Sequence, residues 1–179
     1  MSNADTSLSI LKANFLSTST QSMPFAGIIF WSTIGIAGFY LSLKILAIAT
    51  AFGSGAIFPL AVLIDKLRGR NLIEQGKDNP LTKMFLQSLC MVALLWPLVI
   101  LGGMEKPVFV VLGAAILTGI VWIPYGWAAE DPVGRHHAIA RGVLCYLAYI
   151  FVLKPYKASA ICAAVLFCYC YSLAKMRRP

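Results

Sequence analysis

The sequence predicts an all-α membrane protein in which about six transmembrane helices form one bundle. Of its 179 residues, 59% are hydrophobic and 12% are charged, and the mean hydropathy is +0.79. A soluble domain carries about 25% charged residues. The charges are also grouped, and the uncharged stretches between them approach the ~20 residues that a helix needs to cross the hydrocarbon core of a bilayer. The length predicts a single domain.

The spans are placed by the charges that bound them. Residues 23–174 form the expected transmembrane domain, and the predicted spans are 24–43, 45–65, 84–104, 107–128, 138–153 and 158–174. The fifth contains an uncharged run of only 142–153, so it is long enough only if it begins near Ala138 and Arg141 snorkels to the headgroups. Residues 154–157 are expected to turn the last two spans into a helical hairpin.

The two ends of the chain have a different composition. Residues 1–22 are rich in Ser and Thr, and Leu8, Leu11 and Phe15 recur at helical spacing. This predicts either a helix lying on the membrane surface or a disordered segment. It does not match a secretory signal, which needs a basic region and a separate apolar core. Residues 175–179 form a short basic tail.

Lysine and arginine are distributed unequally between the two ends of the predicted spans. If the spans alternate in direction, eleven of the fifteen cations fall on one side and four on the other. The larger group is Lys12, Lys66, Arg68, Arg70, Lys77, Lys83, Arg135, Arg141, Lys175, Arg177 and Arg178, and the smaller is Lys44, Lys106, Lys154 and Lys157. The positive-inside rule then places both termini in the cytoplasm.

The formal net charge of +8 is assigned to membrane topology and to contact with lipid headgroups. No nucleic-acid-binding motif accompanies it, so nucleic acid is not an expected partner. The cysteines all fall in apolar runs, where each is expected to act as a small buried hydrophobic residue rather than in a disulfide or a zinc site. They are Cys90, Cys145, Cys162, Cys168 and Cys170.

The densest group of polar residues follows the fourth span, and Asp65 at the end of the second span is expected to lie at the same membrane depth. Together these residues are Asp65, Glu130, Asp131, Arg135, His136, His137 and Arg141. Histidines and carboxylates can bind a metal or transfer protons. The spacing of known metal motifs is absent, however, and adjacent histidines point to different faces of a helix. An ordinary loop facing lipid headgroups is therefore favoured, and no catalytic residue, metal or cofactor is assigned.

Three prolines are expected to kink the spans: Pro59, Pro97 and Pro124. Pro59 and Pro124 each precede a carboxylate by six residues, so both lie at a similar depth. Kinks at matching depth would open a vestibule, although prolines are also common in spans without any function. In the second span, small residues at intervals of four favour close helix packing. The alternative there is a broken helix at residues 52–55 that lines a cavity.

Several short motifs, taken in order, resemble a family of small, uncharacterised, multi-span bacterial membrane proteins. They are Met23-Pro24-Phe25 before Trp31, Phe58-Pro59-Leu60-Ala61, Asn79-Pro80-Leu81 and Ile123-Pro124-Tyr125-Gly126-Trp127. The resemblance covers residues 23–127, and nothing after Glu130 contributes to it. It implies a bacterial cytoplasmic membrane and assigns no activity or catalytic residue.

The expected function is the binding or transport of a small molecule or lipid. The secure spans contain no buried charge, which argues against ion-coupled transport through carboxylates at the middle of the membrane. One alternative is an intramembrane enzyme that uses the polar group at the cytoplasmic face, and another is an accessory subunit of a membrane complex. Membrane lipids are expected partners, together with a second copy of the chain or another membrane protein.

Overall fold

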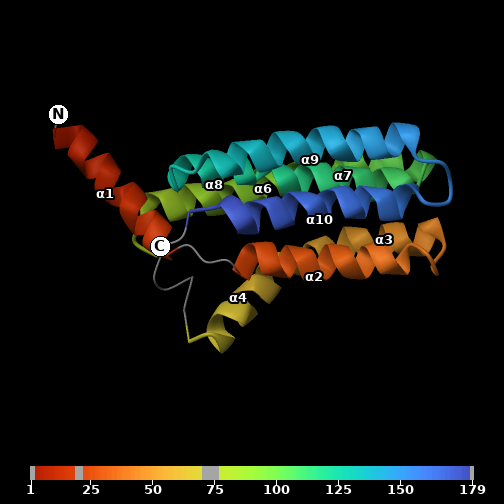
Figure 1. Ribbon diagram of the computed structural model, residues 1–179, viewed down its shortest axis with the longest axis horizontal. Helices are drawn as coiled ribbons and strands as arrows, with labels where there is room; N and C mark the ends of the chain where they lie inside the picture. The colour runs from red at the N-terminus through yellow and green to blue at the C-terminus, as the bar shows by residue number, and fades with distance from the viewer. Residues whose placement is uncertain (1–2, 19–21, 70–76, 178–179) are drawn as a thin grey trace.

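The computed structural model describes residues 3–18, 22–69 and 77–177, and the regular structure in these ranges is entirely α-helical. The helices that run along the long axis are α2 (Ser22–Ala37), α3 (Leu43–Ser54), α6 (Pro80–Glu105), α7 (Val108–Ile120), α9 (Pro132–Phe151) and α10 (Lys157–Lys175). Figure 1 shows them side by side, with short turns joining α2 to α3, α6 to α7 and α9 to α10 at one end. Arg70 and Arg178, two of the cations used for the topology, lie outside the described residues.

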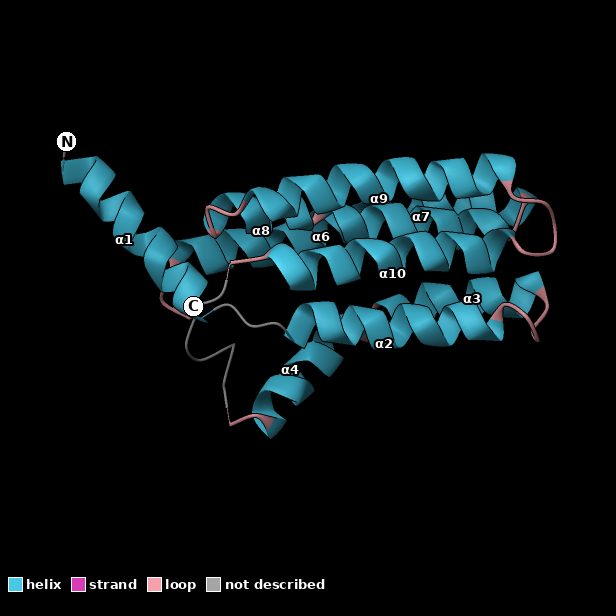
Figure 2. Cartoon of the chain, viewed as in Figure 1, coloured by secondary structure: helices cyan, strands magenta, loops and turns pink. Residues whose placement is uncertain are grey.

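Helices α7 and α10 occupy the middle of the bundle. Helix α7 packs against α3, α6, α9 and α10, and α10 also packs against α2. Together with the neighbouring helices they form the main apolar core, which includes Trp31 of α2, Leu46 of α3, Val111 of α7, and Ile161 and Val165 of α10. In Figure 2 most of the loops lie at the ends of the bundle, so the core is built mainly by helix faces.

Three helical segments in the described part of the chain are long and apolar enough to cross a membrane. They are Pro80–Glu105, Val108–Ala128 and Lys157–Lys175, and a bent pair formed by α3 and α4 (Ile57–Leu67) would be a fourth. These lengths and compositions indicate a membrane protein. Helix α2 has 16 residues and falls in the shorter class, so six spans are not established by helix length and composition.

The first predicted span is too long. Helix α2 ends at Ala37, and residues 38–42 turn before α3 begins. The Ser42 side chain accepts a hydrogen bond from the Ile45 N–H and so caps the next helix. The predicted spans were bounded by charged residues, and this turn contains none. Gly38 and Ser42 interrupt the helix instead.

The fifth predicted span begins too late. Helix α9 starts at Pro132, six residues before the predicted start. The Asp131 carboxylate accepts a hydrogen bond from the Val133 N–H at 2.9 Å, and Pro132 occupies the first turn. The pair Asn79-Pro80 starts α6 in the same way. An Asx residue followed by proline is a helix-start signal, and it moves residues 132–137 from the predicted loop into the helix.

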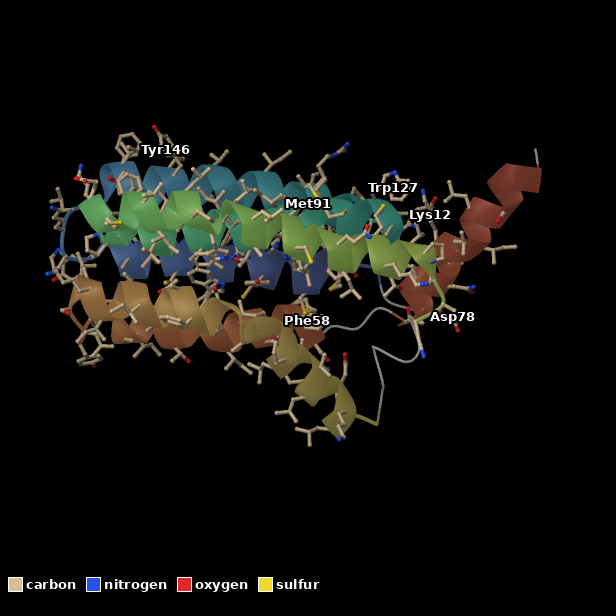
Figure 3. All side chains as sticks on the ribbon, turned by 180° about the vertical axis from the view of Figure 1, so that it is seen from behind. Lys12, Phe58, Asp78, Met91, Trp127 and Tyr146 are labelled. Atoms are coloured by element: carbon tan, nitrogen blue, oxygen red, sulfur yellow. The ribbon has the colours of Figure 1, made fainter. Side chains whose placement is uncertain are left out.

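The second predicted span is broken. Helices α3 and α4 meet at an angle of 52°, and Gly55 and Ala56 separate them. Figure 1 shows α4 leaving the bundle axis, and Figure 3 shows Phe58 close to that point. The broken-helix alternative is therefore correct. Close packing also holds at Gly53, since a Cβ atom there would lie 2.7 Å from a ring carbon of Phe30.

Two of the three prolines predicted to kink helices follow breaks. Pro59 is the third residue of α4, and Pro124 is the third residue of α8 (Trp122–Ala128), which follows α7 after a turn at Val121. Proline lacks the N–H that would bond to the residue four positions earlier, so each marks a place where the preceding helix is interrupted. Pro97 lies inside the continuous helix α6.

The N-terminal segment contains a helix, α1 (Asn3–Thr18), that packs against α6 and α8. The Phe15 side chain is buried between the rings of Phe85 and Tyr125. Lys12 forms an ion pair with Glu130 at 3.1 Å, and its ammonium lies 4.7 Å from the ring centroid of Trp127. Figure 3 shows Lys12 and Trp127 next to each other. Of the two predicted alternatives, the helix is correct for residues 3–18.

Candidate functional site

The predicted polar group is divided among separate contacts. Asp65 is buried and accepts a hydrogen bond from the Ser22 hydroxyl at 2.6 Å. Glu130 pairs with Lys12, while Asp131 caps α9 and accepts from the Arg177 N–H at 2.7 Å. Arg135 is exposed. Asp65, Glu130 and Asp131 therefore fasten helical segments to one another.

The two histidines have different environments. The His136 ring is exposed and lies within hydrogen-bond distance of the Tyr171 hydroxyl, whereas His137 is fully buried. Among the described residues no carboxylate is a hydrogen-bond partner of either ring. No group of three or more metal-binding side chains occurs in that part of the chain either. The convergence that an acid–base site at this face requires is not present there.

Arg141 and His137 instead form a buried polar cluster in the centre of the bundle. They lie one turn apart on α9, and both side chains are 0% exposed. The Arg141 Nε donates to the Ala115 carbonyl of α7 at 2.6 Å, and Nη2 donates to the Thr118 hydroxyl. Nη1 lies 3.4 Å from His137 Nε2. The prediction that Arg141 snorkels to the headgroups is therefore wrong, because α9 begins at Pro132 and Arg141 lies well inside the helix, where its side chain packs against α7.

The proton on the His137 ring can be assigned from its neighbours. A guanidinium only donates hydrogen bonds, so Nε2 must accept from Arg141. Nδ1 then carries the proton and donates to the Ser172 hydroxyl at 2.7 Å, with the Cys168 carbonyl at 3.2 Å. The imidazole is thus neutral in this arrangement, and Arg141 keeps the only charge of the cluster.

Aromatic rings surround this cluster. The Trp122 ring stacks on His137 with centroids 4.1 Å apart and planes at 13°. The Arg141 guanidinium lies 5.0 Å from the ring centroid of Tyr169 and 5.4 Å from that of Trp31. A cation over a ring face is attracted by the ring quadrupole. These rings shield the charge from the apolar core without neutralising it.

Two glycines make room for the cluster. A Cβ atom at Gly119 would lie 2.8 Å from Arg141 Cδ, so the arginine stem crosses α7 where no side chain exists. A Cβ atom at Gly27 would clash with the Tyr169 ring. The close approach of α2, α7, α9 and α10 therefore depends on these two positions.

A cavity of about 220 Å³ lies beside the cluster. Its wall contains both helix interruptions: Ser54 and Gly55 at the end of α3, and Val121 and Trp122 at the junction of α7 and α8. The rest of the wall is mostly apolar, from residues of α2, α4 and α6. Residues of the two breaks thus border one space.

Thr118 and Tyr169 connect the cavity with the buried arginine. Both contribute to the cavity wall, and both contact the Arg141 guanidinium. The Thr118 hydroxyl also donates to the Ala114 carbonyl at 2.7 Å, so its proton is already used. The polar part of the wall therefore lies directly against a positive charge.

The placement of the cysteines differs partly from the prediction. Cys145, Cys162 and Cys168 are buried, but Cys90 and Cys170 are exposed on the surface of the bundle. All five are free thiols. An apolar run does not say which face of a helix a residue occupies, and these two lie on outward faces.

Sequence reasoning found His137 and Arg141 but assigned them to the wrong surroundings. It did not identify Thr118, Tyr169, Trp31 or Ser172. The sequence does contain an indication of this site: Val133, His137, Arg141 and Cys145 recur every four residues and so lie on one side of a helix. All four are buried in α9. A helix starting at Pro132 makes that stripe visible.

Comparisons with known proteins give one result. The chain from residue 12 to residue 177 matches the model of a family described as "Family of unknown function (DUF7010)". No curated protein and no solved structure matches the chain. The match supports the expectation of an uncharacterised family, and it includes the residues after Glu130, to which the sequence resemblance did not extend. The chain belongs to this family of unknown function.

Proposed function

We propose that this protein binds a small, largely apolar molecule inside a membrane-embedded bundle. The observation that supports this most directly is the cavity beside the two helix interruptions. Ligand pockets are concave and mostly apolar, with a few polar groups that fix the orientation of the ligand. The cavity has a volume of about 220 Å³, which suits a short alkyl chain or a small ring.

Transport of that molecule is a second candidate, favoured by the bend between α3 and α4. Interrupted helices that border a central cavity occur in transporters, where one part rocks against another. Helix α4 packs mainly on α2, whereas α3 packs on α7 and α2. A hinge at Gly55 and Ala56 would let α4 move while α3 stays attached to the bundle.

The ligand-binding proposal is tested by filling the cavity. Gly55 lines it, and a Cβ atom there would meet only the Phe52 carbonyl oxygen at 3.5 Å. Gly55→Leu should therefore fold and occupy part of the space. In a variant whose only tryptophan is Trp122, 8-bromooctan-1-ol should quench the tryptophan fluorescence saturably. Gly55→Leu should reduce the affinity of this probe at least about tenfold, because the filled pocket no longer offers apolar contacts to it.

The control is a variant whose only tryptophan is Trp127, which is 50% exposed on the surface. Its quenching should rise without saturation, because the probe reaches it from the detergent or lipid. Equal, non-saturating quenching at Trp122 and Trp127 would contradict the proposal.

The membrane arrangement proposed here has six crossings, with both termini in the cytoplasm of a bacterium. The alternation of α2, α3–α4, α6, α7–α8, α9 and α10 along one axis supports it, as does the charge asymmetry. The outer face of α6 is apolar and exposed, including Leu94, Leu98 and Met104. Lipid, a second copy of the chain or another membrane protein would cover this face, so the role of an accessory subunit remains an alternative.

Cysteine labelling tests this topology. In a cysteine-free background, Asp78→Cys should be protected from a membrane-impermeant maleimide in intact cells, and Lys106→Cys should be labelled. Asp78 precedes α6 and Lys106 follows it, and both side chains are exposed. Figure 3 shows Asp78 at the end of the bundle that carries α1. Labelling of Asp78→Cys but not Lys106→Cys would invert the topology, and equal labelling would mean that α6 does not cross.

A further inference from the structure

We propose that the ligand of the cavity carries an anionic head, a carboxylate or phosphate, which is held beside Arg141 while an apolar tail fills the remaining space. This inference rests on the proposed binding function and names the class of molecule bound. Its basis is a buried positive charge next to the cavity.

The charge of Arg141 has no counter-ion within the described residues. Its hydrogen-bond partners are the Ala115 carbonyl, the Thr118 hydroxyl and the His137 ring, all of them neutral. The only ion pair in that part of the chain joins Lys12 to Glu130. Isolated buried charges are costly and are normally paired, so an anion from outside the chain would complete this site.

The hydrogen-bonding capacity of the cluster is also incomplete. A guanidinium has five N–H donors, and the three bonds just described leave two of them without an acceptor in the described part of the chain. The buried indole N–H of Trp31 has no partner either. The Arg141 guanidinium lies 5.4 Å from the ring centroid of this tryptophan, so the two residues with unused donors belong to the same cluster. Carboxylate and phosphate oxygens are acceptors that a guanidinium can bind through two parallel bonds.

The position of the charge explains why the ligand would be amphipathic. Thr118 and Tyr169 form the part of the cavity wall that contacts Arg141, whereas Phe58, Leu89 and Val92 provide apolar surface elsewhere. An anionic head placed near Thr118 would be attracted by the charge of Arg141, and the tail of the same ligand would contact the apolar residues. A small inorganic anion would leave the apolar wall unused.

A structural role for Arg141 is the competing explanation. In that case the arginine would only fasten α9 to α7 through the Ala115 carbonyl. The Ala115 carbonyl lies inside helix α7 and the Thr118 hydroxyl already bonds to Ala114, so neither group needs the arginine to be satisfied. The two explanations therefore predict different effects of head-group charge on binding.

The experiment measures competition against labelled octanoate on purified wild-type protein in maltoside detergent by scintillation proximity. Octyl phosphate should compete about as well as octanoate. Octan-1-ol should be at least about tenfold weaker, as expected for loss of hydrogen bonds to a charged group, and octylammonium weaker still. Acetate and inorganic phosphate, which test the head without a tail, should compete only at much higher concentration.

Variants then assign the effect to Arg141. Arg141→Gln should reduce the affinity for octanoate at least about tenfold and leave that for octan-1-ol nearly unchanged, while Arg141→Lys should retain part of the preference. Arg177→Gln, an exposed arginine outside the cavity, is the matched control. If Arg141→Gln does not fold, the wild-type series alone decides.

Saturable binding of labelled octan-1-ol, with no preference for octanoate, would overturn this inference and leave the proposed function intact. If neither molecule bound saturably, both this inference and the proposed binding function would be wrong. Acetate competing as well as octanoate would overturn the amphipathic ligand.

Discussion

Gly134→Ala should lower the free energy of unfolding by about 2 kcal/mol or more, because the new methyl group has no space. A Cβ atom at Gly134 would lie 2.6 Å from Gly126 Cα and still closer to the Trp122 carbonyl oxygen. These neighbours are backbone atoms of α8 and cannot move aside as a side chain can. The contact also sets the position of Trp122, so the substitution should disturb the cavity as well.

Gly142→Ala, on the same helix, is the matched control. A Cβ atom at Gly142 would meet nothing within 4 Å, so alanine should leave stability unchanged or raise it by up to ~1 kcal/mol through helix propensity. Thermal unfolding of both variants in one detergent, followed by intrinsic fluorescence and by size-exclusion chromatography, measures the difference. Equal melting temperatures would contradict the close packing of α8 on α9.

His137→Ala should cost about 3 kcal/mol and release Arg141 from its present position. The substitution removes the ring that stacks on Trp122 and leaves the Ser172 hydroxyl without its histidine partner. Loss of a buried ring and of its hydrogen bonds each contributes a few kcal/mol or less. The Trp122 emission maximum should also shift to longer wavelength, because water or detergent reaches the vacated space.

His136→Ala provides the control for this prediction. The two histidines are adjacent in the chain, but His136 is exposed, and its one hydrogen bond within the described ranges is to the Tyr171 hydroxyl. Its replacement should change the unfolding free energy by no more than ~0.5 kcal/mol. If both substitutions had the same small effect, His137 would not be part of a buried cluster.

The positions of three of the six predicted spans follow from charge alone. The uncharged runs predicted the third, fourth and sixth spans to within a few residues of Pro80–Glu105, Val108–Ala128 and Lys157–Lys175. The method failed where a helix begins or ends without a charge, as at Gly38 and Ser42. It failed again at Pro132, where the helix-start signal had been counted as part of a loop.

The candidate site could be predicted only in part, because burial depends on the direction in which a side chain points. Pro59 and Pro124 were recognised as a matched pair, and both follow breaks whose residues border the cavity. Arg141 is recognisable in the sequence as a charge in an apolar region, but a helix predicted to start near Ala138 places it at the helix end, close to the headgroups, whereas α9 starts at Pro132. Thr118 and Tyr169 lie in apolar runs with no distinguishing motif, and only the packing of α7 and α10 against α9 brings them together.

If an amphipathic anion occupies the cavity beside Arg141, as proposed above, the position of its tail can be measured directly. A crystal structure with 8-bromooctanoate, recorded at the bromine absorption edge, would locate the end of the tail. The account predicts one anomalous peak inside the bundle, within the cavity lined by Gly55, Thr118 and Trp122, with the carboxylate oriented towards Arg141. Bromine found only on the outer, lipid-facing surface of the helices, with the cavity empty, would contradict it.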